Sequence, residues 1–299
     1  MIGVSTIFFG YLGMAIDKKV KRIIDIFAKA QKQPFVQIGA SRPGMPYDEV
    51  VNALQRFRRE TGVEYSIHQS IWLPSDDFYL NIASSNDHIR RTSIDSLKKS
   101  IDFARRIESQ NVSFHAGYAT DRLTQVNEFQ PLDPVDEIPY DNAYNNSVAS
   151  LNELIDYANG EIRLSIENFN HRPERRYMFS LPEDFAHLPK NVGVIANVGH
   201  LFYTEQLLKN SSYVKNMIEA FKSRVMEMHL NDNDGSEDQH MLVGHGKIPV
   251  EEMVKLTSIN GRVPKLIIES HKSRHSYSDT DLVENIKTMH DMSERLSSK

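Results

Sequence analysis

The feature that most constrains the fold of this chain is an alternation of short apolar runs with longer amphipathic stretches. The short runs are rich in β-branched residues, which is typical of buried strands, and the stretches between them have helical periodicity. The predicted strands are Ile2–Phe8, Phe35–Ile38, Glu64–His68, Val112–His115, Arg163–Glu167, Val192–Asn197, Val225–Leu230 and Leu266–Glu269. The predicted helices lie near residues 16–31, 46–60, 86–109, 140–158, 181–187, 203–220, 249–258 and 279–296.

Eight strand–helix units in one chain predict an α/β fold, the (β/α)8 TIM barrel. Apolar strands joined by helical crossovers indicate a parallel sheet. The 299 residues would suffice for two average domains, but no linker rich in Gly, Ser or Pro divides them. We therefore expect a single barrel domain over residues 1–299, in which the irregular stretch 117–139 forms a long loop on the functional face.

The composition excludes several classes of protein. Hydrophobic residues make up 40% and charged residues 25%, as in ordinary soluble globular proteins. The net charge of −5 gives no strong field that would attract a polyanion, although a local basic rim remains possible. We find no apolar run long enough to span a membrane and no signal peptide, so we expect a cytoplasmic protein. Cysteine is absent, so any metal ion must be bound by imidazole nitrogen and by oxygen.

Six consecutive predicted strands carry, at or next to their last residue, a side chain that can bind a metal ion, at the position where barrel enzymes carry their active sites. These residues are His68, His115, Glu167, Asn197, His229 and Glu269, and the loops that follow add His200, Asp238 and His240. Each residue alone could be a structural histidine, a helix cap or a surface carboxylate. Together, at one barrel mouth, they would be costly without a cation. Imidazole and carboxylate ligands suit Zn²⁺, Mn²⁺ or Fe²⁺, and their number predicts a site for more than one ion.

The motifs around these residues have a recognisable order. They are His115-Ala116-Gly117, Ile166-Glu167-Asn168, Asn197-Val198-Gly199-His200, His229-Leu230-Asn231-Asp232, Asp238-Gln239-His240 with Gly244-His245-Gly246-Lys247-Ile248, and Ile268-Glu269-Ser270. In this order the set resembles the endonuclease IV (type 2 AP endonuclease) family of the xylose isomerase-like TIM barrel superfamily, over the span from about His68 to Glu269.

The resemblance implies a zinc-dependent DNA repair enzyme that hydrolyses the phosphodiester bond 5′ to abasic sites in double-stranded DNA, acting as a monomer. It implies two or three ions, with Glu167 and Glu269 as catalytic carboxylates. The first ion would be held by His68 and His115, with Glu167 as a bridge to the second. The second would be completed by Asn197, His229 and Glu269, and the third would be bound by His200, Asp238 and His240.

The chain also departs from the family pattern. Asn197 stands where the family has an aspartate, and the first strand lacks a histidine that the family often has. For DNA binding, the resemblance implies Ile71 and Trp72 as side chains inserted into the duplex, although Trp72 could instead pack over the barrel rim. The expected phosphate contacts are Arg42, Arg172, Arg175, Arg176, Lys272 and Arg274, although a solvated charge run explains the Arg172–Arg176 segment equally well.

Two other functions remain open from the sequence. A divalent-metal sugar isomerase or epimerase of the same superfamily would use Glu167, His200, His229 and Glu269, but it has no need of His68, His115 and the Asp-x-His pair. A protein that recognises damaged DNA without cutting it efficiently is the third alternative, and Asn197 is the only residue that supports it.

Overall fold

The computed structural model describes residues 1–10, 14–39, 46–69, 72–75, 78–121, 137–171 and 177–298 of the chain. The described residues form a closed barrel of parallel strands that pair in sequence order, and the last strand returns to pair with the first. The strands are β1 (Ile2–Ser5), β2 (Phe35–Ile38), β3 (Glu64–His68), β4 (Asn111–Phe114), β5 (Arg163–Glu167), β6 (Val192–Asn197), β7 (Val225–Leu230) and β8 (Lys265–Ile268). The predicted (β/α)8 barrel is therefore confirmed.

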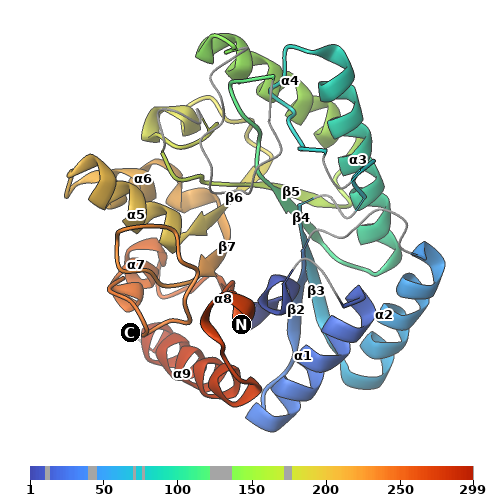
Figure 1. The fold of residues 1–299 in the computed structure, drawn as a ribbon, viewed down its shortest axis with the longest axis vertical. Helices are drawn as coiled ribbons and strands as arrows, with labels where there is room; N and C mark the ends of the chain where they lie inside the picture. The colour runs from blue at the N-terminus through green and yellow to red at the C-terminus, as the bar shows by residue number, and fades with distance from the viewer. Residues whose placement is uncertain are drawn as a thin grey trace.

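The helices lie outside the strands (Figure 1). They are α1 (Ile16–Ala30), α2 (Tyr47–Thr61), α3 (Asp87–Arg106), α4 (Tyr140–Ala158), α5 (Val198–Leu208), α6 (Tyr213–Phe221), α7 (Val250–Thr257), α8 (Lys272–His275) and α9 (Asp279–Ser297). The described residues also form the short 3₁₀ helices η1 (Thr6–Phe9), η2 (Pro182–Phe185) and η3 (Lys222–Arg224). The first and last long helices, α1 and α9, pack side by side, and Arg22 of α1 pairs with Asp279 at 2.9 Å. None of the described helices is both long and apolar enough to cross a membrane.

Helix α1 illustrates how the sequence produces the outer layer. Val20, Ile23, Ile24 and Phe27 recur at helical spacing and are buried against the sheet. Burying each such side chain contributes about 1.5–3 kcal/mol. The helix ends at Gln31, whose left-handed backbone (φ 56°) lets its N–H reach the carbonyls of the last turn.

Some predicted elements differ from the observed ones. The predicted helix near 181–187 is only the 3₁₀ helix η2, because the Asp184 carboxylate accepts the N–H groups of Ser180 and Leu181 and closes a short turn. The predicted helix near 203–220 starts earlier, at Val198, and is divided into α5 and α6, because Lys209 adopts a left-handed conformation.

Two smaller differences lie at the ends of the barrel. The first strand stops at Ser5, whose hydroxyl accepts the Ile7 N–H and starts a 3₁₀ turn. The short helix α8 after the last strand was not predicted, since four residues leave no periodic signal. The predicted long loop 117–139 lies mostly outside the described residues.

Candidate metal centre

The carboxyl ends of the strands bring the nine predicted ligands into one contiguous cluster. His68, Glu167, Asn197 and His229 lie at or next to the last residue of their strands, and His200 lies in the first turn of α5. The remaining members directly follow a strand or lie in the loop after β7; they are His115, Glu269, Asp238 and His240. The cluster is largely buried.

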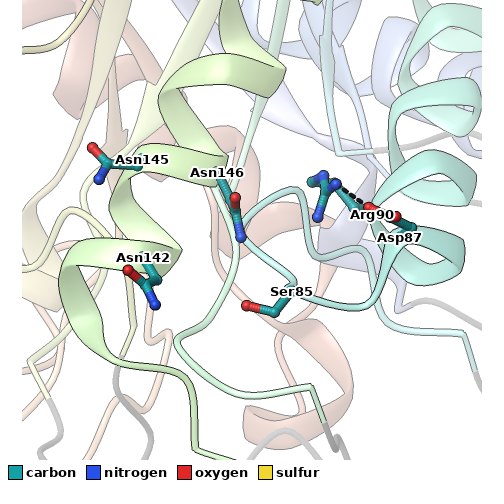
Figure 2. Close-up of a pocket in the computed structure, with 6 residues that line it drawn as sticks. All are labelled: Ser85, Asp87, Arg90, Asn142, Asn145 and Asn146. Carbon is teal, nitrogen blue, oxygen red and sulfur yellow. Dashed lines mark hydrogen bonds and ion pairs between the residues drawn. The ribbon is translucent and has the colours of Figure 1, made fainter.

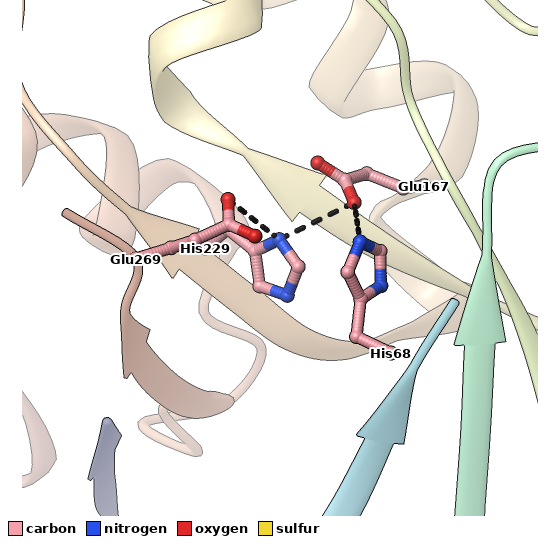
Figure 3. Close-up of side chains that lie close together, drawn as sticks. All are labelled: His68, Glu167, His229 and Glu269. Carbon is pink, nitrogen blue, oxygen red and sulfur yellow. Dashed lines mark ion pairs between the residues drawn. The ribbon is translucent and has the colours of Figure 1, made fainter. Parts of the chain in front are cut away.

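Four of these side chains form what we call the first ligand group, which consists of His68, Glu167, His229 and Glu269 (Figure 3). Glu167 Oε2 lies 3.0 Å from His68 Nε2 and 3.3 Å from His229 Nδ1, and Glu269 Oε2 lies 3.2 Å from the same His229 nitrogen. His115 borders the group, with its Nε2 3.3 Å from Glu167 Oε2. Glu167 Oε2 thus faces three imidazole nitrogens.

A second ligand group consists of His200, Asp238 and His240. Asp238 Oδ2 lies 3.2 Å from His200 Nε2 and 3.5 Å from His240 Nε2. The two groups adjoin, because His200 Nδ1 lies 3.5 Å from Glu167 Oε1 and His240 Nδ1 lies 4.0 Å from Glu269 Oε2.

Three of the histidines are oriented by acceptors other than the ligand atoms of the cluster. His200 Nδ1 lies 2.9 Å from the Asn168 carbonyl, and His240 Nδ1 lies 2.9 Å from the Glu269 carbonyl. His68 Nδ1 lies 3.0 Å from Ser113 Oγ, which donates its own hydrogen to the Ile67 carbonyl. In each case Nδ1 carries a hydrogen, so Nε2, which faces a carboxylate of the cluster, is the nitrogen available to a cation. Such an arrangement is typical of metal-binding histidines.

The charges of the cluster depend on one another. Burial opposes the ionisation of Glu167, but the neighbouring histidines, His229 first, hold the pKa of its carboxyl well below its usual range. Burial also opposes the charged form of His240, but Asp238 raises its pKa to about 9. Burial lowers the pKa of His115 to about 4, so this imidazole stays neutral and available as a ligand. A cation would replace protons that the metal-free cluster holds.

The residues fit a divalent cation. Glu167 Oε2, His229 Nδ1 and Asp238 Oδ1 are buried and make no hydrogen bond to the residues that the structure describes. The ligand atoms of a tetrahedral ion with bonds of about 2.0–2.1 Å lie about 3.3 Å apart. The contacts of 3.0–3.3 Å in the first group and of 3.2–3.5 Å in the second are close to this value. The donor set of imidazole and carboxylate suits zinc, manganese or iron.

Asn197 lies between the two glutamates of the first ligand group. Its Nδ2 donates to Glu167 Oε1 at 2.8 Å and to Glu269 Oε2 at 3.1 Å. Its Oδ1 accepts the backbone N–H groups of Gly199 and His200 and so caps α5. The predicted ligand therefore sits at the expected place, with its amide nitrogen toward the carboxylates.

The pattern of polar residues at strand ends does not predict some residues of the centre. Below the cluster, inside the barrel, Gln37 Nε2 lies 2.9 Å from His229 Nε2 and 3.2 Å from the buried Glu227 carboxylate. At the mouth, the half-buried Phe169 ring stacks on Tyr177 and on His200, with centroid distances of 3.7 and 5.1 Å. A polar residue in mid-strand was the available signal for Gln37 and for Glu227. No sequence pattern indicated Phe169.

The predicted DNA contacts are placed only in part. Arg42, Ile71 and the run Arg172–Arg176, which includes Arg175, lie outside the described residues. Trp72 is half-buried and packs on Tyr47 and Phe103, with centroid distances of 4.6 and 5.3 Å. Of the remaining cations, Lys272 pairs with Asp279 at 2.9 Å.

A separate pocket lies between the start of α3 and the start of α4 (Figure 2). It is lined by Ser85, Asp87, Arg90, Asn142, Asn145 and Asn146. Arg90 already pairs with Asp87 and donates to the Ser84 carbonyl. The pocket shares no residue with the candidate metal centre.

The chain belongs to the xylose isomerase-like TIM barrel family, whose model matches residues 24–292. It is 25% identical over 292 residues to the uncharacterized protein MJ1614 of Methanocaldococcus jannaschii, which covers 96% of this chain and 98% of the relative. A D-tagatose 3-epimerase-like protein shares the fold with a TM-score of 0.72 at 20% identity, over 99% of this chain and 98% of that one. The TTHB071 protein from Thermus thermophilus, soaked with ZnCl2, matches with a TM-score of 0.63 at 14% identity, over 96% and 98%.

These comparisons confirm the superfamily that the sequence motifs indicated. The similar solved structures include several sugar 3-epimerases. At identities of 20% or less, however, such similarity establishes the fold alone.

Proposed function

We propose that this chain is a divalent-metal hydrolase that cleaves the phosphodiester bond 5′ to abasic sites in double-stranded DNA. The observation that supports this proposal is the second ligand group, His200, Asp238 and His240, directly beside the first. Two adjacent ion sites suit hydrolysis of a phosphate ester. A sugar isomerase needs one ion and would leave the second group without a role.

We assign separate roles in this reaction to the residues of the centre. Divalent cations bound here would lower the pKa of water to near neutrality and would stabilise negative charge on the phosphate. Glu167 joins the two groups, since its two oxygens face histidines of both. Glu269, the second carboxylate of the first ligand group, would help to hold the ion that activates the attacking water.

The test compares incision of a duplex carrying a tetrahydrofuran abasic-site analogue by the zinc-loaded protein and by the variant Asp238→Asn. We expect the variant to lose at least about 100-fold in rate, because loss of a ligand should cost more than loss of an outer hydrogen-bond partner. The matched control is Asp234→Asn, an exposed carboxylate of the same loop, which should incise normally. If the unmodified protein does not cut the duplex with Zn²⁺, Mn²⁺ or Fe²⁺, the hydrolase proposal is wrong.

A sugar isomerase or epimerase is the second candidate. Glu167 and Glu269 lie on either side of the His229 nitrogen, which supports proton transfer by two carboxylates around one ion, and sugar 3-epimerases share the fold. In this case Asp238→Asn would leave ketose conversion nearly intact, whereas Glu269→Gln would abolish it. Assaying both variants on both substrates separates the two functions, and tight binding of the abasic duplex without either reaction would favour the binding protein.

A further inference from the structure

The orientation of the Asn197 amide is fixed by its surroundings. One end of the amide faces the backbone N–H groups of Gly199 and His200, at 2.9 and 3.2 Å, and Asn231 Nδ2 at 3.1 Å. Backbone N–H groups only donate, so the atom that faces them must be the oxygen. With three donors around it, this oxygen has no lone pair left for a cation. Gly199 is required for this packing, because a side chain there would collide with Asn231 Oδ1.

The amide nitrogen must therefore face the glutamates. Its two hydrogens point at Glu167 Oε1 and Glu269 Oε2, at 2.8 and 3.1 Å. An aspartate in the same position would keep the helix cap but would place its second oxygen against both carboxylates. Three carboxylates in contact repel one another strongly unless a cation lies between them. In this chain the amide N–H groups supply the positive charge that the cation would otherwise provide.

We infer that Asn197 is not a metal ligand and that its amide replaces one ion of the centre, so that the chain binds two ions. This inference rests on the metal centre of the proposed function. One ion is held by the first ligand group around Glu167 Oε2, with His115 at its border, and the other by the second ligand group. The charge balance also favours two ions. The negative charges of the three carboxylates Glu167, Asp238 and Glu269 nearly balance two divalent cations, but they would leave the charge of a third cation uncompensated.

The experiment is a count of bound zinc. The protein and the variant Asn197→Asp are saturated with ZnCl2, dialysed, and measured by elemental analysis against protein concentration. We expect about two equivalents in the unmodified chain and about three in the variant, because the new carboxylate completes the missing ligand set.

The matched control is Asn81→Asp. Asn81 is a buried asparagine with the same hydrogen-bonding pattern, because its Oδ1 accepts backbone N–H groups and its Nδ2 donates. The acceptor of its Nδ2 is a backbone carbonyl, however, and not a carboxylate of the metal centre. Its zinc content should stay at about two equivalents.

Three equivalents in the unmodified chain, or no increase in a folded Asn197→Asp variant, would overturn the inference. If the aspartate variant does not fold, the count in the unmodified chain and in Asn197→Ala decides, since both should hold about two equivalents. The count requires no DNA, so two equivalents without incision would refute the hydrolase while the inference stands. No bound zinc in any variant would refute the inference together with the metal centre.

Discussion

At the level of single residues, Gln37 is the contact that positions His229. Gln37 Nε2 lies 2.9 Å from His229 Nε2, and Gln37 Oε1 makes no hydrogen bond to the described residues. When His229 Nδ1 binds a cation, Nε2 carries the hydrogen and needs an acceptor. Gln37 Oε1 becomes that acceptor if the amide turns over, which exchanges its oxygen and nitrogen and gives up the hydrogen bond from Nε2 to the Glu227 carboxylate. Gln37 is therefore a positioning residue for a predicted ligand.

The substitution Gln37→Leu should weaken zinc binding at the first ligand group by about 10-fold or more, since it removes the partner of a ligating imidazole. Competition with a chromogenic chelator measures the dissociation constant directly. Ser66→Ala is the control, because Ser66 donates to Glu227 in the same network at 3.1 Å without touching His229. Equal losses in both variants would show that the barrel floor as a whole, and not the contact with His229, determines the affinity.

The residues of the centre differ in how far sequence could predict them. The candidate ligands lie at strand ends, where alternation and barrel topology bring side chains to one mouth. Gln37 and Glu227 face the interior in mid-strand, and their contact depends on how β2 and β7 oppose each other across the barrel. The role of Asn197 depends on the donors of α5 and on Asn231, which no pattern of residue types reveals.

At the level of elements, the loop after β7 is held in place by one buried carboxylate. Asp232 accepts the backbone N–H groups of Asn233, Gly244 and Ile248 at 2.9–3.0 Å. It also pairs through its backbone with Met241, which closes the loop that carries Asp238 and His240. Gly246 has no side chain because any Cβ there would collide with Asp232. The motif residues around the second ligand group thus build the loop.

The substitution Asp232→Asn should remove the zinc ion of the second ligand group while the barrel stays folded. The amide would point an N–H group at backbone donors, which costs about 1–3 kcal/mol and loosens the loop. Zinc content should fall by about one equivalent, and the far-ultraviolet circular dichroism should not change. Asp234→Asn, on the exposed tip of the same loop, should keep its zinc. A full zinc content in Asp232→Asn would contradict the assigned role.

Helices long enough to show a clear amphipathic period were predicted closely, whereas short elements were not. The predicted helix at 140–158 coincides with α4, because nineteen residues carry several turns of amphipathic pattern. Among the described residues between β5 and β6, the only helix is the 3₁₀ helix η2, and its fold follows from side-chain hydrogen bonds of Asp184 that leave no periodic signal. Phe185 of this 3₁₀ helix packs on Phe221 of the outer helix α6, with ring centroids 5.1 Å apart.

At the level of the whole molecule, closure of the barrel gathers ionisable groups whose pKa values move in opposite directions. Burial lowers the pKa of His115 to about 4 and that of His271 to about 3. In the unfolded chain both imidazoles take up protons near pH 6.5, so the metal-free fold loses stability as the pH falls below that value. His240 acts in the other direction, because Asp238 overcomes the effect of burial and raises its pKa to about 9.

The ion pair of His240 with Asp238 stabilises the metal-free fold fully below pH 6.5, and this contribution disappears as the pH rises through about 9. The metal-free protein should therefore be most stable near pH 6.5.

Zinc requires unprotonated imidazoles, so its stabilising effect grows as the pH rises over the same range. We expect the difference in melting temperature between zinc-loaded and EDTA-treated protein to widen from about pH 6.5 to about pH 8.5. In the metal-free variant Asp238→Asn the decline above pH 6.5 should be shallower, because His240 has lost its partner. Thermal melts across this range check both expectations, and a constant gap between the loaded and metal-free proteins would show that the histidines of the cluster do not bind the metal.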